Sequence, residues 1–184
     1  MNSTTDISTL LVIDVQGAVV DGSADVPGVI SRINGLLERA RKSGTRIIFI
    51  QHEEEGEEEL TAGSAGWQMV ADLDYRSGDT VVHKRFRDGF AGTELDSLLQ
   101  ESGTTRLFVT GSQSDYCVQT TATSALAHGY DVALVRDAHT TCAANVDSGV
   151  IEAESVIDFV NNHFATMRYP GRHLEVISAA DVNF

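Results

Sequence analysis

The chain has 184 residues, a length that suits one domain, and its 42% hydrophobic and 22% charged residues are typical of globular rather than disordered proteins. Its 13 Lys and Arg residues against 27 Asp and Glu residues give a formal net charge of -14. Such an acidic chain lacks the basic patches that bind nucleic acid and is not attracted to anionic membranes, so we expect neither partner.

Short apolar runs alternate with helical patterns along the chain. Between Pro27 and Gly44, for example, apolar side chains recur at helical spacing. Strands separated by helices predict an α/β fold whose parallel sheet has helices on both faces, and a loop is expected through Asp137 after the fifth strand. The predicted strands are Leu10–Ile13, Arg46–Ile50, Thr80–His83, Arg106–Thr110, Val132–Val135 and Leu174–Ile177, and the predicted helices are Val29–Ala40, Thr93–Gln100, Ser114–Ala127 and Gly149–Asn162.

The organisation of the chain is simple. No repeat, linker or composition shift divides it, so we expect a single domain over residues 1–184. No targeting signal is visible, and two cysteines, Cys117 and Cys142, are too few for a disulfide framework. We therefore expect a cytoplasmic protein with reduced thiols.

Three residues with chemical potential follow predicted strands. Asp14 ends the first strand, Lys84 ends the third, and Cys117 lies after the fourth, at the start of a helix. Ligands of such sheets bind outside the carboxyl ends of the strands, so these side chains are expected to meet there.

The predicted position of Cys117 suggests a nucleophile. Unpaired N–H groups in the first turn of a helix favour thiolate over thiol and can hold an oxyanion. Asp14 could then move the proton, and Lys84 could stabilise both anions. Taken singly, each residue has a plainer interpretation: a small buried side chain for Cys117, a turn residue for Asp14 and a solvated charge for Lys84.

Three segments in this order resemble the isochorismatase-like cysteine hydrolases. They are Leu11–Gln16, which contains Asp14, His83–Phe86, which contains Lys84, and Val109–Val118, which contains Cys117. The resemblance implies a doubly wound, mainly parallel six-stranded sheet with helices on both faces, and Asp14, Lys84 and Cys117 as a catalytic triad. It also implies cleavage of an amide or related C–N bond of a small molecule through an acyl-thioester.

The same resemblance implies further features. A cis peptide bond between Ser112 and Gln113 is expected to shape an oxyanion hole made by the backbone N–H groups of Gln113 and Cys117. Family members include nicotinamidases, N-carbamoylsarcosine amidases, ureidoacrylate amidases, streptothricin hydrolases and isochorismatases. Family habit also suggests a homo-oligomer. Isochorismatases lack the nucleophilic cysteine, so Cys117 argues against vinyl ether hydrolysis.

Metal and cofactor binding are not expected. Nicotinamidases of this family hold a metal through an Asp-x-His motif after the second strand, whereas here His52 is followed by Glu53 without that spacing. No phosphate-cradling glycine loop follows Asp14, which disfavours a nucleotide cofactor. A metal-assisted nicotinamidase and a non-catalytic flavodoxin-like binding domain remain the alternatives.

Aromatic residues near the triad are candidates for substrate contact. We expect Trp67 and Tyr116 to line the substrate pocket, with plain packing as the alternative. Cys142 and His139 match no catalytic segment and are predicted to be structural.

Overall fold

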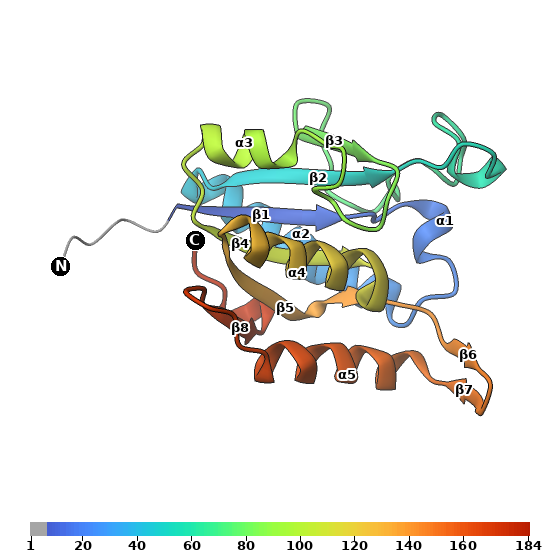
Figure 1. The fold of residues 1–184 in the computed structure, drawn as a ribbon. Helices are drawn as coiled ribbons and strands as arrows, with labels where there is room; N and C mark the ends of the chain where they lie inside the picture. Colours follow the sequence, from blue (N-terminus) through green and yellow to red (C-terminus); the bar gives the residue numbers. More distant parts are fainter. Residues whose placement is uncertain (1–6) are drawn as a thin grey trace.

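A computed structural model describes residues 7–184. Its central sheet has six parallel strands in the order β3-β2-β1-β4-β5-β8, which confirms the predicted fold class (Figure 1). The strands are β1 (Ser8–Ile13), β2 (Arg46–His52), β3 (Thr80–Lys84), β4 (Arg106–Ser112), β5 (Asp131–Thr140) and β8 (Leu174–Ile177).

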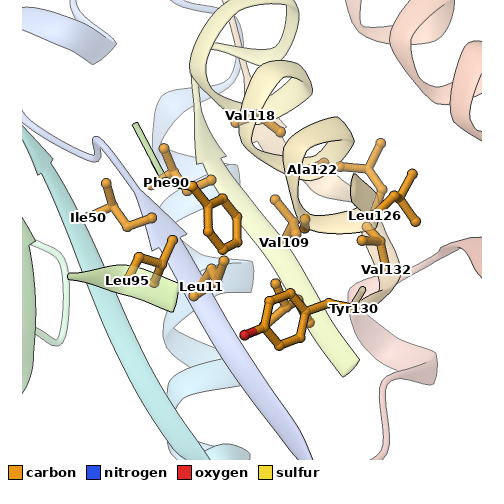
Figure 2. Packing of buried hydrophobic residues seen from close by; sticks show 14 of the residues in the cluster. Leu11, Ile50, Phe90, Leu95, Val109, Val118, Ala122, Leu126, Tyr130 and Val132 are labelled. Carbon is orange, nitrogen blue, oxygen red and sulfur yellow. The ribbon is translucent and has the colours of Figure 1, made fainter. Parts of the chain in front are cut away.

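Helices cover both faces of the sheet, so the strands read as continuous apolar runs. On one face, α2 (Val26–Ser43) packs on Leu10, Val12 and Phe49. On the other face, Leu11, Ile50 and Val109 pack against α4 (Gln119–His128) and its neighbours (Figure 2). The remaining elements are α1 (Gly17–Val20), α3 (Leu95–Glu101), α5 (Ala153–Thr166) and the short 3-10 helices Glu58–Leu60 and Ala179–Asp181, and α3 and α5 lie on the same face as α4.

The strand order reverses direction between β1 and β4. The chain crosses from β1 towards β2 on one side, and later returns to β4 on the other side of β1. Loops that leave the carboxyl ends of the two strands at such a switch point diverge and open a crevice. Gly111 lets β4 approach β1 here, because its φ is +117° and a Cβ would collide with the carbonyl oxygen of Ile13.

The fifth strand is longer than predicted. The sequence predicts a loop through Asp137, but pairing of β5 with β4 resumes after a bulge, with Gly111 opposite His139 and Ser112 opposite Thr140. Asp137 therefore lies inside β5 rather than at the sheet edge. Its carboxylate accepts a hydrogen bond of 2.7 Å from the Ala179 N–H, which anchors the C-terminal segment.

The predicted helix Gly149–Asn162 is wrong over its first turn. Gly149 and the two residues after it form strand β7 (Gly149–Ile151), which pairs with β6 (Ala144–Val146) in a hairpin, and α5 begins only at Ala153. The φ of Gly149 is +135°, and β-branched Val150 and Ile151 favour extended backbone. Within residues 7–184, no helix is both long and apolar enough to cross a bilayer.

Candidate active site

The structure brings Asp14, Lys84 and Cys117 together at the carboxyl edge of the sheet. The Lys84 ammonium lies 2.6 Å from Asp14 Oδ2, and both side chains are fully buried. The same ammonium donates a hydrogen bond of 3.2 Å to Cys117 Sγ. One ammonium thus contacts both a carboxylate and a thiol, although the three groups come from separate segments of the chain.

Asp14 is positioned by an unusual backbone turn. Its φ of 49° is in the left-handed region, which turns the chain sharply at the end of β1. Its N–H donates to the Ile50 carbonyl at 2.9 Å, so the turn is tied to β2. Asp14 Oδ2 is 2.6 Å from the Lys84 ammonium, and a carboxylate with this partner still has lone pairs that can accept a proton.

Lys84 is the last residue of β3, at the edge of the sheet. Alternation along the strand places its side chain inward while His83 is exposed. Besides Asp14 and Cys117, its ammonium contacts His52 Nδ1 at 3.2 Å. Three partners hold the cation at the centre of the site.

Cys117 lies in a single π-helical turn, Ser114–Val118, rather than in the regular helix Ser114–Ala127 that the sequence predicted. The Val118 N–H donates to the Gln113 carbonyl at 3.1 Å, five residues back, and α4 starts one residue later. The expected cis peptide bond between Ser112 and Gln113 is present just before this turn.

The ionisation of the thiol differs from the prediction. The helix start and Lys84 were expected to favour thiolate. Instead, burial raises the pKa of the Cys117 thiol to about 12, and the Asp14 charge adds to the rise while Lys84 opposes it. Burial also raises the pKa of Asp14, against the opposing effect of Lys84. Burial and the Asp14 charge thus favour the protonated form of the thiol, and burial makes the Asp14 carboxylate more basic than a solvated one.

Gln16, which the sequence pattern does not identify as a site residue, fixes the loops around the triad. Its side-chain amide donates to the carbonyls of His52 and Trp67, both at 2.8 Å, and accepts from the His52 N–H at 2.7 Å. Gln51 donates a second hydrogen bond of 2.8 Å to the Trp67 carbonyl. Two buried amides thus join the end of β2 to the loop around Trp67.

A cavity of about 350 Å³ opens onto the thiol. Tyr116 lines it, as predicted, and is 37% exposed. Trp67 does not line it, since its indole stacks on the His83 ring with centroids 5.8 Å apart. The lining residues are Asp14, Ala18, Val19, His52, Leu60, Arg87, Gln113, Tyr116 and Cys117. His52 and Arg87 were not predicted as substrate contacts, because loop geometry rather than spacing brings them here.

The segment before Cys117 is held by side-chain contacts. Gln113 Nε2 contacts the Val19 carbonyl at 3.3 Å and Cys142 Sγ at 3.4 Å. Cys142 also contacts the Asp21 carbonyl and the Ser23 hydroxyl. These contacts give Cys142 the structural environment that was predicted for it.

Ser114, the first residue of the π-helical turn, is anchored by a buried polar chain. The Asn161 amide donates to the Arg136 carbonyl at 3.0 Å, so its oxygen faces His139 Nε2 at 3.1 Å and accepts from it. His139 Nδ1 is then the acceptor for the Ser114 hydroxyl at 2.7 Å. Burial lowers the pKa of His139 to about 4, which keeps the imidazole neutral. His139 is structural, as predicted.

Both ring nitrogens of His52 lie near charged side chains. His52 Nδ1 faces the Lys84 ammonium, and Nε2 is 3.5 Å from Glu54. In the part of the chain that the structure describes, no group of three or more His, Cys, Asp or Glu side chains is placed to hold an ion.

Comparison with known proteins shows the family of the chain. The model of the isochorismatase domain matches residues 8–155. The chain belongs to the isochorismatase family. A structure of a hydrolase of this family from Chromobacterium violaceum superposes with a TM-score of 0.86 and 27% identity, covering 98% of this chain and 94% of that one.

Relatives with named activities are also similar. A streptothricin hydrolase from Streptomyces noursei is 38% identical over 138 residues, which cover 73% of this chain and 50% of the relative. The family member described here thus matches only about half the length of that relative. A ureidoacrylate amidohydrolase from Yersinia enterocolitica is 27% identical over 174 residues, covering 73% of this chain and 75% of the relative.

Proposed function

We propose that this protein is a cysteine hydrolase that cleaves an amide or related C–N bond of a small molecule through an acyl-thioester on Cys117. The observation that carries the proposal is the contact of the Lys84 ammonium with both Asp14, at 2.6 Å, and Cys117, at 3.2 Å, beside an open cavity. A binding domain would have no need of a buried carboxylate, a buried ammonium and a thiol at one point. This geometry therefore favours the enzyme over the flavodoxin-like alternative.

In the first half of the reaction, Asp14 acts as general base. Its carboxylate takes the proton of the Cys117 thiol as the sulfur attacks the substrate carbonyl carbon, forming an S–C bond and an oxyanion. The backbone N–H groups of Gln113 and Cys117 stabilise that oxyanion. The C–N bond then breaks, the amine leaves with the proton held by Asp14, and an acyl-thioester remains on Cys117.

In the second half, water replaces the amine. Asp14 removes a proton from the water as the water oxygen attacks the thioester carbonyl carbon. The C–S bond breaks, the product leaves as a carboxylic acid, and the proton returns to the sulfur. The sum is amide plus water giving acid plus ammonia or amine.

Lys84 stabilises the charge that moves between the two anions. Negative charge lies on Asp14 in the resting state and on the sulfur as the proton is transferred, and the ammonium contacts both groups. The raised pKa of Asp14 makes it a better proton acceptor, and Lys84 limits how far thiolate formation is disfavoured. The site thus forms its nucleophile at the moment of attack.

The names of two relatives support the proposal: the streptothricin hydrolase is named for hydrolysis, and the ureidoacrylate amidohydrolase for hydrolysis of an amide. The metal-assisted nicotinamidase alternative is disfavoured because a cation already occupies the position beside His52 Nδ1. A single domain over 1–184, cytoplasmic location and homo-oligomerisation stay predictions.

The proposal is tested with a panel of primary amides, ureido acids and lactams, scored by ammonia release and product mass. At least one class should be hydrolysed by the wild-type chain and by Cys142→Ala, but not by Cys117→Ala. Circular dichroism of both variants establishes that they are folded. Turnover by folded Cys117→Ala at the wild-type rate would overturn the proposal.

A further inference from the structure

Arg87 lines the same cavity as Cys117 and has no role in the chemistry derived above. It lies in the loop after β3, three residues beyond Lys84, and is exposed. Its guanidinium carbon is 3.9 Å from the centroid of the Tyr116 ring, so the planar cation lies over the aromatic face. This stacking holds a positive group at the mouth of the cavity while leaving its N–H donors open to the side.

Within the described part of the chain, Arg87 lines the cavity without an acidic partner, a property that it shares with Arg39, Arg46, Arg136 and Arg168, none of which lines the cavity. Among residues 7–184, no carboxylate lies within ion-pair distance of its guanidinium. The acidic residues next to Arg87 and Tyr116 in sequence bind elsewhere. Asp88, beside Arg87, accepts from the Phe90 N–H and the Ser124 hydroxyl, and Asp115, beside Tyr116, accepts from the Thr141 hydroxyl. Six other arginines do have carboxylate neighbours within 4.0 Å: Arg32, Arg41, Arg76, Arg85, Arg106 and Arg172.

The Asp14 carboxylate in the cavity lining is neutralised by Lys84, which is not itself a lining residue. Asp14 and Lys84 form an ion pair of 2.6 Å, and the lining also includes apolar Ala18, Val19 and Leu60. An unneutralised guanidinium thus remains at the rim of an otherwise balanced pocket, in a chain whose net charge is -14. A guanidinium binds a carboxylate through two parallel N–H···O hydrogen bonds, which neutral amides cannot match in strength.

We infer that Arg87 is a specificity residue and that the substrates are small amides or ureido compounds that carry a carboxylate remote from the scissile carbonyl. The carboxylate binds Arg87 at the rim, and the carbonyl reaches Cys117 at the base of the cavity. The inference rests on the proposed function for its reaction, while the binding of the carboxylate itself does not depend on catalysis.

The test uses the monoamides of malonic, succinic, glutaric and adipic acids, each compared with its neutral methyl ester. Ammonia release reports cleavage of the amide alone, and chain length varies the separation of carboxylate and carbonyl. For the best length, the KM of the acid should be about tenfold below that of its ester, since the bond to Arg87 is charge-assisted but solvent-exposed. The preference should weaken as salt is added, because exposed charges are screened.

Arg87→Gln should bring the ratio of the two KM values close to one, and Arg87→Lys should restore part of it. Arg85→Gln is the matched control, because Arg85 is also exposed, lies two residues away and is paired with Glu53 at 3.1 Å. That variant should keep the wild-type ratio. Equal KM values for acid and ester in the wild type, or an unchanged ratio in Arg87→Gln, would overturn the inference.

A binding measurement separates this inference from the hydrolase proposal. Calorimetry with glutaric acid monoamide and its ester on Cys117→Ala measures affinity without turnover. Tighter binding of the acid, abolished by adding Arg87→Gln, supports the inference even if no amide is hydrolysed. Hydrolysis of neutral amides without any preference for the acid would leave the hydrolase intact and reject the role of Arg87.

Discussion

The Lys84 ammonium lies 3.2 Å from Cys117 Sγ and 2.6 Å from Asp14 Oδ2, so one buried cation contacts both the proposed nucleophile and the proposed base. The Asp14 carboxylate and a Cys117 thiolate would therefore share the same counter-ion. Asp14 raises the pKa of the thiol, whereas Lys84 lowers it. Variants of the two residues should therefore change thiol ionisation in opposite directions.

Asp14→Asn should lower the pKa of the Cys117 thiol while abolishing amide hydrolysis. The substitution removes the negative charge that disfavours thiolate and leaves Lys84 as the partner of the sulfur. Thiolate absorbance in a pH titration and the rate of iodoacetamide alkylation both report this change, with Cys142→Ala as background to isolate one thiol. Asp115→Asn is the control, since its carboxylate binds the Thr141 hydroxyl. A less reactive Cys117 in Asp14→Asn would contradict the account.

Lys84→Met should destabilise the protein by about 3–5 kcal/mol, because it leaves the Asp14 carboxylate buried without a counter-ion. Adding Asp14→Asn should recover much of the loss without restoring activity. Denaturant unfolding of the two single variants and the double variant measures both effects. The exposed pair Lys42–Glu38 gives the comparison, and Lys42→Met should change stability far less than Lys84→Met does. Independent, additive effects of the Asp14 and Lys84 substitutions would contradict a coupled buried pair.

Much of the site could be predicted from the sequence, because it follows from strand ends. Asp14 and Lys84 come at the ends of apolar runs, and parallel strands place such residues at one edge. The pKa of Cys117 could not be predicted in this way. Its place at a helix start favours thiolate, but burial and the charge of Asp14 dominate, and both depend on packing between distant segments.

The errors in the fold prediction have similar causes. The extension of β5 to Thr140 depends on a bulge and on pairing with Ser112, which local periodicity does not show. The β6–β7 hairpin precedes α5 directly, so exposed Val150 and Ile151 resembled a first helical turn. The positions of Gln16 and Arg87 in the site depend on how loops fold, and loop sequences have no periodicity from which those positions could be predicted.

His139 should make stability depend on pH between about 4 and 6.5. Its pKa falls from 6.5 to about 4 on folding, so in this range the unfolded chain binds the proton more strongly. Its contribution to stability is complete above pH 6.5 and is lost as pH falls towards 4, by about 3 kcal/mol in total. Asp14, with a raised pKa, acts with the opposite sign over the range above its unfolded value of 3.8.

The comparison of wild type with His139→Gln isolates this effect. Glutamine has no titrating group, so the difference in free energy of unfolding between the two proteins should shrink as pH falls from 7 to 4. Urea unfolding at several pH values provides the measurement. A difference that is constant with pH would show that the imidazole is not buried and neutral.

Activity should survive dialysis against a strong chelator. The nucleophile is a thiol and the oxyanion donors are backbone N–H groups, so the proposed steps need no Lewis acid. A cation at His52 Nδ1 would also be repelled by the Lys84 ammonium at 3.2 Å. Loss of activity on chelation and its recovery with zinc or iron would replace this mechanism with the metal-assisted one, and His52→Ala would then be the first variant to make.

The most direct test of the central claim is rapid-quench mass spectrometry of the protein during turnover of an amide that it hydrolyses. Acid quenching preserves a thioester, and peptide mapping locates it. The account predicts that the mass of the peptide that contains Cys117 increases by the mass of the acyl group. The peptide that contains Cys142 should show no such increase, and the Cys117→Ser variant should form no thioester at position 117. Turnover without any covalent adduct on Cys117 under conditions that slow deacylation, or an acyl group on another residue, would contradict it.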